Sequence, residues 1–211
     1  LSERMNDTSE TTMTAVQELL IQMKKNILGF ETDSGKDDMI SGRITINYQW
    51  SGDAVYAINE AEDESGVLLG YCIPDTVSNL WFDGWVMPKG ANVEVATAFI
   101  NFLSMPKNAV RNMYCIGYTS CIGGKEVFDY LKDTYEAEEG DTTAVIYDLS
   151  YFFGDTVDGE AVISAPKEQL SRQLFAQYPD AETMKRCVAM KYFEADANSR
   201  ANKMWQEVLA S

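Results

Sequence analysis

Aromatic and acidic side chains occur together in one short apolar segment, Trp81-Phe82-Asp83-Gly84-Trp85. If this segment is a strand, alternate residues point to the same side, so Trp81, Asp83 and Trp85 share one face. A carboxylate among aromatic rings suits an ammonium ligand, because the rings attract the cation and the acid accepts a charge-assisted hydrogen bond. The alternative is an edge strand whose Asp83 faces water while the tryptophans pack locally.

Two further aromatic residues stand where a ligand cleft could form. Trp50 ends the alternating segment 43–50, and ligands of open α/β sheets bind beyond the carboxyl ends of strands. The alternative, which the residues alone favour, is that Trp50 simply ends the buried face of that strand. Tyr118 follows Gly117, which marks a helix end leading into an exposed ring. That pattern is common, so it carries little weight alone.

Histidine is absent, which excludes the most frequent general base, the triads that need one, and the most frequent zinc ligand. The cysteines do not have the spacing of a zinc site. Cys115 and Cys121 could form a disulfide in an oxidising compartment, whereas buried free thiols are the alternative for all four cysteines. We therefore expect no enzyme, no cofactor and no metal site. The four cysteines are Cys72, Cys115, Cys121 and Cys187.

The overall composition is that of a globular protein with an acidic surface. Of the 211 residues, 45% are hydrophobic and 24% charged, and 33 acidic against 17 basic residues give a net charge of −16. This charge disfavours nucleic acid and weakly favours cations, although salt screens surface charge within about 10 Å. We expect neither a membrane span, which needs about 20 apolar residues, nor a signal peptide. The leucine at position 1 suggests a mature or excised product.

Strands alternating with helices predict an α/β fold. Residues 43–50 alternate strictly and predict an interior strand in which Ile44, Ile46 and Tyr48 are buried. The apolar runs 67–73 and 80–87, each followed by proline, predict further strands. Helical periodicity predicts helices at 7–27 with a capping box at Asp7 and Glu10, at 53–61 capped by Asp53, at 93–103, at 106–116, and in several short pieces from 148 to the C-terminus. Residues 136–142 predict an acidic loop.

The chain resembles the polyamine-binding proteins of bacterial ABC importers, which capture spermidine or putrescine. No single motif carries this resemblance; the ordered set, which spans nearly the whole chain, does. The matching segments are 50–54 (WSGDA), 78–83 (SNLWFD), 87–91 (MPKGA), 99–103 (FINFL), 116–118 (IGY), 178–183 (YPDAET) and 204–208 (MWQEV).

The resemblance implies a type II periplasmic-binding-protein fold that closes on its ligand by hinge motion. It implies that Trp50, Trp81 and Tyr118 wall the polyamine and that Asp83 receives an ammonium group. The position where some members place a ligand-contacting glutamine holds Met190. This departure leaves open one terminal-amine contact, and with it the choice between short and long polyamines.

The resemblance also implies a domain order, a location and partners. Residues 1–80 match the second lobe with its start missing, 81–123 the segment returning to the first lobe, and 124–211 a helical return to the second lobe. The protein would act outside the cytoplasm and deliver its polyamine to a membrane permease. As a fragment it would expose apolar surface that favours self-association. The alternatives are the same scaffold binding another small organic solute, and a fragment without independent binding.

Overall fold

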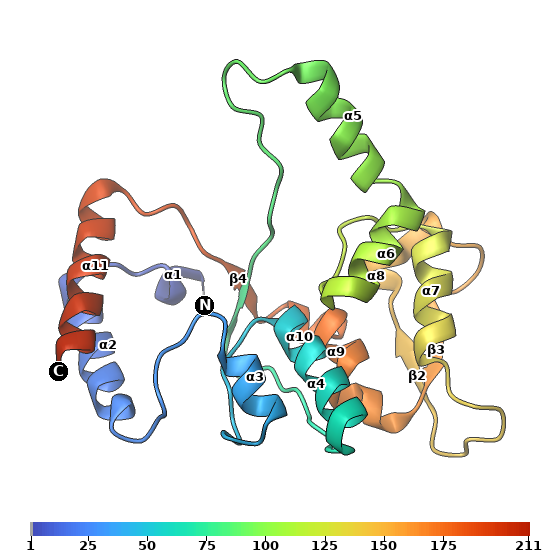
Figure 1. Ribbon diagram of the computed structural model, residues 1–211, viewed down its shortest axis with the longest axis horizontal. Coiled ribbons are helices and arrows are strands. Elements are labelled where there is room, and N and C mark those ends of the chain that lie inside the picture. The colour runs from blue at the N-terminus through green and yellow to red at the C-terminus, as the bar shows by residue number, and fades with distance from the viewer. Residues whose placement is uncertain (1) are drawn as a thin grey trace. The chain divides into compact units, whose positions relative to one another are not determined.

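The computed structural model of the chain describes residues 2–211. Helices carry most of the regular structure, and the strands found among these residues form two separate two-stranded sheets (Figure 1). The chain divides into two compact units, each assembled from segments distant in sequence. Unit 1 comprises the residues up to Asp33 together with 74–82 and 186–211, and unit 2 comprises 34–73 and 83–185.

Unit 1 is held together by a pair of helices packed side by side, α2 (Glu10–Lys24) and α11 (Ala195–Ala210) (Figure 1). The α2 helix begins at Glu10 because the side chain of Ser9 accepts a hydrogen bond from the Thr12 amide. The predicted capping residue Asp7 is therefore not the N-cap; it accepts a hydrogen bond from the Ser9 amide at 2.9 Å. None of the α2 residues, all of which are described, is fully buried.

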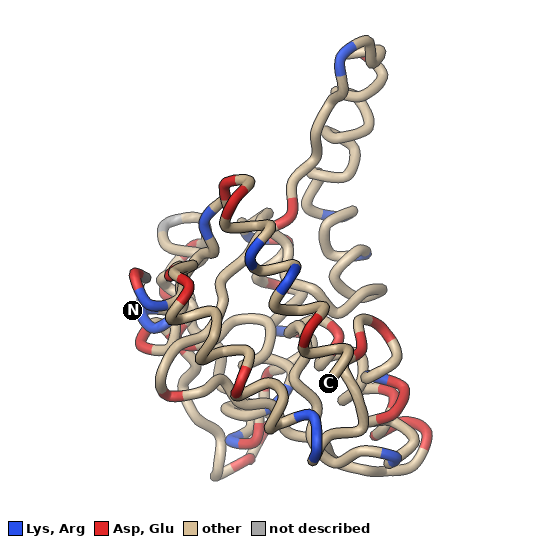
Figure 2. The backbone as a smooth tube through the Cα atoms, turned by 90° about the vertical axis from the view of Figure 1, so that its left-hand side faces the viewer, with Lys and Arg blue, Asp and Glu red and all other residues tan. Residues whose placement is uncertain are grey.

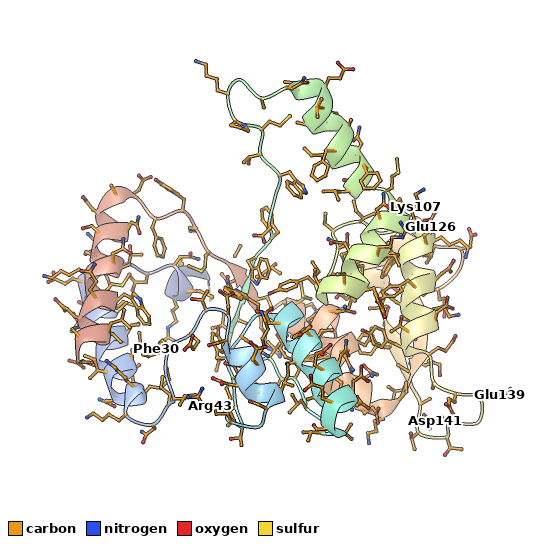
Figure 3. The ribbon with its side chains drawn as sticks, in the orientation of Figure 1. Phe30, Arg43, Lys107, Glu126, Glu139 and Asp141 are labelled. Carbon is orange, nitrogen blue, oxygen red and sulfur yellow. The ribbon has the colours of Figure 1, made fainter. Side chains whose placement is uncertain are left out.

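The sheet of unit 1 joins β1 (Ser78–Leu80) and β4 (Cys187–Ala189) in parallel, with Leu80 opposite Ala189. The short helix α1 (Ser2–Met5) lies against β4. Phe30, labelled in Figure 3, meets the Trp205 ring edge-on with centroids 5.0 Å apart. These contacts connect segments that lie far apart in the sequence.

Unit 2 contains the larger core, which we call the core cluster. It forms where the antiparallel strands β2 and β3 pack with helices α6, α7 and α9. The elements of unit 2 are α3 (Gly35–Ile40), α4 (Ser51–Ser65), α5 (Val93–Leu103), α6 (Pro106–Ile116), α7 (Lys125–Tyr135), β2 (Val145–Asp148), α8 (Ser150–Phe153), the 3-10 turn Gly154–Thr156, β3 (Val162–Ala165), the 3-10 turn Lys167–Ser171, α9 (Gln173–Gln177) and α10 (Ala181–Met184). The core cluster comprises Met113, Val127, Phe128, Leu131, Tyr135, Tyr147, Leu149, Phe153, Ala161, Ile163, Ala165, Leu174 and Tyr178.

Residues 83–105, which we call the apolar arm, lie largely in solvent. Figure 1 shows α5 and the chain before it projecting away from the other helices of unit 2. Within the arm, Trp85 meets Phe99 edge-on at 5.7 Å, yet 66% of Trp85 and 51% of Phe99 remain exposed. The arm therefore presents an apolar face that only local contacts partly cover.

The prediction of an interior strand at 43–50 is wrong. All of these residues are described, and none of them lies in a strand. Ile44 is half-buried, while Ile46 and Tyr48 are 86% and 88% exposed. Strict alternation makes a segment able to form a strand, but a strand exists only where a partner supplies the ladder hydrogen bonds.

Some of the other predicted helices and strands are confirmed and some are wrong. The helices at 93–103 and 106–116 are confirmed with these bounds, and Asn92 caps the first of them. The helix predicted at 53–61 runs from Ser51 and has Trp50, not Asp53, at its N-cap. The run 67–73 forms no strand although fully described, and the run 80–87 contributes only its first residue to β1. The elements α3, α7, β2 and β3 were not predicted.

Acidic and basic residues are distributed along the backbone of both units (Figure 2). The predicted acidic loop at 136–142 is confirmed, and Figure 3 shows Glu139 and Asp141 at its outer end. Among the described residues, no helix combines the length and the apolar character that crossing a membrane requires.

Candidate functional site

One end of helix α4 is in contact with the tyrosine predicted to line a ligand site. Trp50 is the N-cap of α4 and is 44% exposed. Two positions later, Gly52 is buried beneath the ring of Tyr118: a Cβ added at Gly52 would stand 2.0 Å from Tyr118 Cδ2. Because no side chain fits there, Gly52 lets the ring lie directly on the helix backbone. Trp50 and Tyr118 are thus brought to the same end of one helix.

A second glycine makes this approach possible from the other side. Gly117 ends α6 in the left-handed conformation, with φ +75°, as the sequence pattern predicted. A Cβ at Gly117 would stand 2.8 Å from the carbonyl oxygen of Gly52 and 3.2 Å from Val55 Cβ. Both the backbone conformation and the close approach require glycine, so the position of Tyr118 depends on a pair of facing glycines.

The buried residue Gln177 holds the segment around Tyr118 in place by hydrogen bonds to Gly117 and Thr119. Gln177, only 6% exposed, donates through Nε2 to the Gly117 carbonyl at 2.9 Å. Its backbone carbonyl accepts a hydrogen bond from the Thr119 hydroxyl at 2.6 Å, and its side-chain oxygen accepts one from Tyr135 at 2.9 Å. This network ties the site segment to the core cluster, because Tyr135 is one of its members.

The negative charges of two carboxylates act on the Tyr118 hydroxyl. Burial raises the pKa of Tyr118 to about 12, and the next largest cause is the negative charge of Asp53, with Asp83 adding a smaller effect of the same sign. Asp53 lies in the first turn of α4 with 17% of its side chain exposed, whereas Asp83 is exposed. Unit 2 therefore presents aromatic rings beside acidic groups, which is a surface that favours a cation.

The remaining predicted site residues, Trp81 and Met190, lie in unit 1. Trp81 directly follows Leu80 and Met190 directly follows Ala189, and Leu80 and Ala189 face each other in the parallel ladder. The two side chains are therefore at the carboxyl ends of neighbouring parallel strands, where ligands of such sheets bind. They are 36% and 57% exposed. Trp81 does not lie within a strand, so the expected shared strand face of Trp81, Asp83 and Trp85 is not formed.

The sequence reasoning missed Asp53, which it assigned to helix capping. Its position three residues after Trp50, in the first turn of a helix that starts beside an aromatic residue, was the available signal. It also missed Lys36, whose Nζ lies 3.4 Å from Asp53 Oδ1. Gly52 and Gln177 act indirectly, by positioning Tyr118, and only the fold reveals that role.

The cysteines form no disulfide, and no candidate metal cluster is found in the part of the chain that the structure describes. All four cysteines are free, so Cys115 and Cys121 are not paired. The alternative of buried thiols is also wrong for three of them, since Cys72, Cys115 and Cys121 are exposed. Among residues 2–211, no group of histidine, cysteine, aspartate or glutamate side chains has an arrangement that could hold a metal ion.

Comparison with known families assigns the chain to a class of binding proteins. The model of the bacterial extracellular solute-binding protein family matches residues 2–124, more than half of the chain. The chain therefore belongs to the bacterial extracellular solute-binding proteins. Trp50, Asp53, Asp83 and Tyr118 all lie inside the matched region.

Three curated relatives confirm the resemblance to polyamine-binding proteins that the sequence predicted. The chain is 32% identical over 91 residues to the putrescine-binding periplasmic protein of Escherichia coli (strain K12), covering 42% of this chain and 25% of the relative. It is 31% identical over 111 residues to spermidine/putrescine-binding periplasmic protein 1 of Haemophilus influenzae (52% and 29%). It is 28% identical over 104 residues to the putrescine/agmatine-binding protein of Pseudomonas aeruginosa (48% and 28%).

The chain spans about a quarter of the length of these relatives. All three relatives are binding proteins by name, and two of them are named as periplasmic, which agrees with the expectation of a binding protein and not an enzyme. The mixed helix and strand content is consistent with the family.

Proposed function

We propose that this chain forms part of the solute-binding component of an ABC importer, which captures a polyamine such as putrescine or spermidine without covalent chemistry. In this proposal the component has the two-lobed type II fold, works outside the cytoplasm and hands its ligand to a membrane permease. Within unit 2 the proposed site residues are Trp50, Asp53, Asp83 and Tyr118. The resemblance further implies a ligand-lining role for Trp81 of unit 1, and Met190 stands where some members place a ligand-contacting glutamine, which leaves one amine contact open.

One observation carries the proposal: the Tyr118 ring lies on the first turn of a helix that begins with an exposed tryptophan and carries Asp53, and the charges of Asp53 and Asp83 both act on its hydroxyl. An alkyl ammonium needs both an anion and an apolar wall, since its charged end and its carbon chain require different surroundings. The names of the relatives point to the same class of ligand.

Substitution of Asp83, the proposed anionic anchor, tests the proposal most directly. A hydrogen bond to a charged group contributes roughly 1.5–3 kcal/mol and each cation–π contact about 0.5–2 kcal/mol. Micromolar binding needs about 8 kcal/mol, so these groups are necessary but not sufficient. Asp83→Asn keeps the side-chain shape and removes the charge, and it is expected to weaken polyamine binding at least about tenfold.

The test is isothermal titration calorimetry of putrescine and spermidine into the chain and its variants. Glu139→Gln is the matched control, because Glu139 is an acidic residue at the outer end of an exposed loop (Figure 3). Unchanged affinity in Asp83→Asn would show that the site is misassigned. If neither amine binds while a sugar or another organic cation does, the ligand class is wrong and the scaffold serves a different solute.

A further inference from the structure

Lys36 forms an ion pair with Asp53, one of the two carboxylates of the candidate site. The ammonium of Lys36 lies 3.4 Å from Asp53 Oδ1, and only 27% and 17% of the two side chains are exposed. By contrast, the Lys125–Asp129 pair on the surface of α7 has 65% and 47% of its side chains exposed. The Lys36–Asp53 pair is therefore screened by water much less than an ordinary surface pair.

The backbone around Lys36 holds it in this place. Lys36 is the second residue of α3, and α3 packs against α4, the helix that carries Asp53. A Cβ at Gly35 would stand 2.7 Å from Asn47 Nδ2, so the start of α3 lies against the segment before α4. The other end of α3 is tied by an ion pair at 3.1 Å between Asp38 and Arg43, which is labelled in Figure 3.

Of the two carboxylates, Asp53 has the stronger electrostatic effect on Tyr118. A ligand ammonium that reaches the ring of Tyr118 would therefore meet Asp53 already paired with another primary ammonium. Lysine and a polyamine present the same chemical group, an ammonium on a flexible alkyl stem.

We infer that Lys36 is a specificity determinant of the solute site: it acts as a tethered ammonium that occupies Asp53 and limits how many positive charges a ligand can bring. This inference rests on the proposed function. With Lys36 in place, Asp53 is neutralised, while none of the ion pairs found among the described residues involves Asp83. A ligand must then displace Lys36 or place its ammonium beside another positive charge, and both cost binding free energy.

Replacing the lysine with a neutral side chain of similar length tests the inference. Lys36→Met keeps the apolar stem and frees Asp53. It is expected to raise the affinity for putrescine about tenfold, with a smaller gain for butylamine, which has one ammonium, and a larger gain for spermidine, which has three. The increase with ligand charge separates an electrostatic effect from a change of shape.

Two variants complete the calorimetric test. Lys132→Met removes a lysine of the same unit that pairs with Glu136 at 3.6 Å on α7, and it should leave affinity unchanged. In the Asp53→Asn background, Lys36→Met should no longer raise affinity, because the carboxylate that it frees is gone. Thermal unfolding of each variant checks that the fold persists, and Lys36→Gln replaces Lys36→Met if the latter melts early.

The outcomes separate this inference from the function on which it rests. If neither the natural chain nor the Lys36 variants bind any of the three amines, the proposed function fails. If the natural chain binds putrescine and Lys36→Met binds it equally or more weakly, Lys36 is a structural partner of Asp53 and the inference is overturned. Binding by Lys36→Met alone, or a gain that grows with ligand charge, supports it.

Discussion

Helix α5 of the apolar arm and helix α7 of the core cluster have the same length, and α5 is the more apolar of the two, yet α7 is the more buried. In α7, Val127 and Leu131 are 0% exposed, because α7 packs against α6 and β3. In α5, a more apolar helix whose residues are all described, no residue is buried and Val93 remains 62% exposed. A periodic pattern shows which face of a helix can be buried, whereas burial itself requires a surface opposite that face.

This difference decides where substitutions should matter. Stability comes from the apolar area that folding removes from water, so a side chain still in water has little to lose. The arm also carries few charges, namely Asp83, Lys89 and Glu94. Its exposed residues are expected to influence association more than folding.

The largest effect should come from the core cluster. Leu131→Ala removes a fully buried side chain and leaves a cavity, so the free energy of unfolding should fall by about 2–5 kcal/mol. Phe99→Ala in the apolar arm is the counterpart, and its cost should be well below that. Urea denaturation of both variants measures the two values. Equal losses would mean that the arm is covered in solution.

The next effect concerns the contact between Gly52 and Tyr118. Gly52→Ala places a methyl group on the tyrosine ring, so the ring must move and the free energy of unfolding should fall by about 1–3 kcal/mol. Gly29→Ala is the control, since a Cβ there meets nothing within 4 Å. The Gly52 variant should also lose polyamine binding, and full binding would contradict the placement of Tyr118 in the site.

Alkaline pH should weaken unit 2 through its buried and half-buried tyrosines. Burial raises the pKa of Tyr135, Tyr147 and Tyr178 as well as that of Tyr118. The unfolded chain loses these protons near pH 10, before the folded chain does. The stabilisation from the neutral rings is therefore complete below pH 10 and declines as pH rises toward the folded values. Denaturation at pH 9 and pH 11 measures the decline, which Tyr118→Phe should make less steep.

The smallest effect is expected at Ile46, where the sequence alone predicted a large one. A buried Ile46 would make Ile46→Ala cost about 2–5 kcal/mol. Because 86% of the side chain is exposed, the cost should instead stay within about 0.5 kcal/mol. Thermal unfolding distinguishes these values, and a large loss would show that segment 43–50 is buried against a partner in solution.

Local signals predicted several of the helices, although not α3 or α7, and predicted the strands poorly. The helix bounds at Asn92 and Pro106 follow from capping and proline geometry, which depend on neighbouring residues only. Strands need a partner distant in sequence, and no local pattern shows whether that partner is present. Strands β2 and β3, each of four residues, were too short for their periodicity to be recognised.

The candidate site was predicted by residue type but not by its internal contacts. The sequence indicated Trp50, Asp83 and Tyr118. The structure adds Asp53, whose negative charge raises the pKa of Tyr118 more than that of Asp83 does. The contact of Tyr118 with Gly52 spans 66 positions and depends on the conformation of Gly117, so no reading of neighbouring residues could have found it. The division of sequence among lobes stays a prediction.

The discontinuous composition of unit 1 has a consequence for how the chain reaches its folded state during synthesis. Strand β1 pairs with β4 more than a hundred residues later, and unit 2 contributes nearly all of the intervening chain. The core cluster, in contrast, lies between Met113 and Tyr178. Closing a loop costs entropy that increases with its length, and contacts distant in sequence form slowly. Unit 2 can therefore begin to fold on the ribosome while unit 1 must wait for the last segment to emerge, so a translational pause after residue 185 would favour the correct order of assembly.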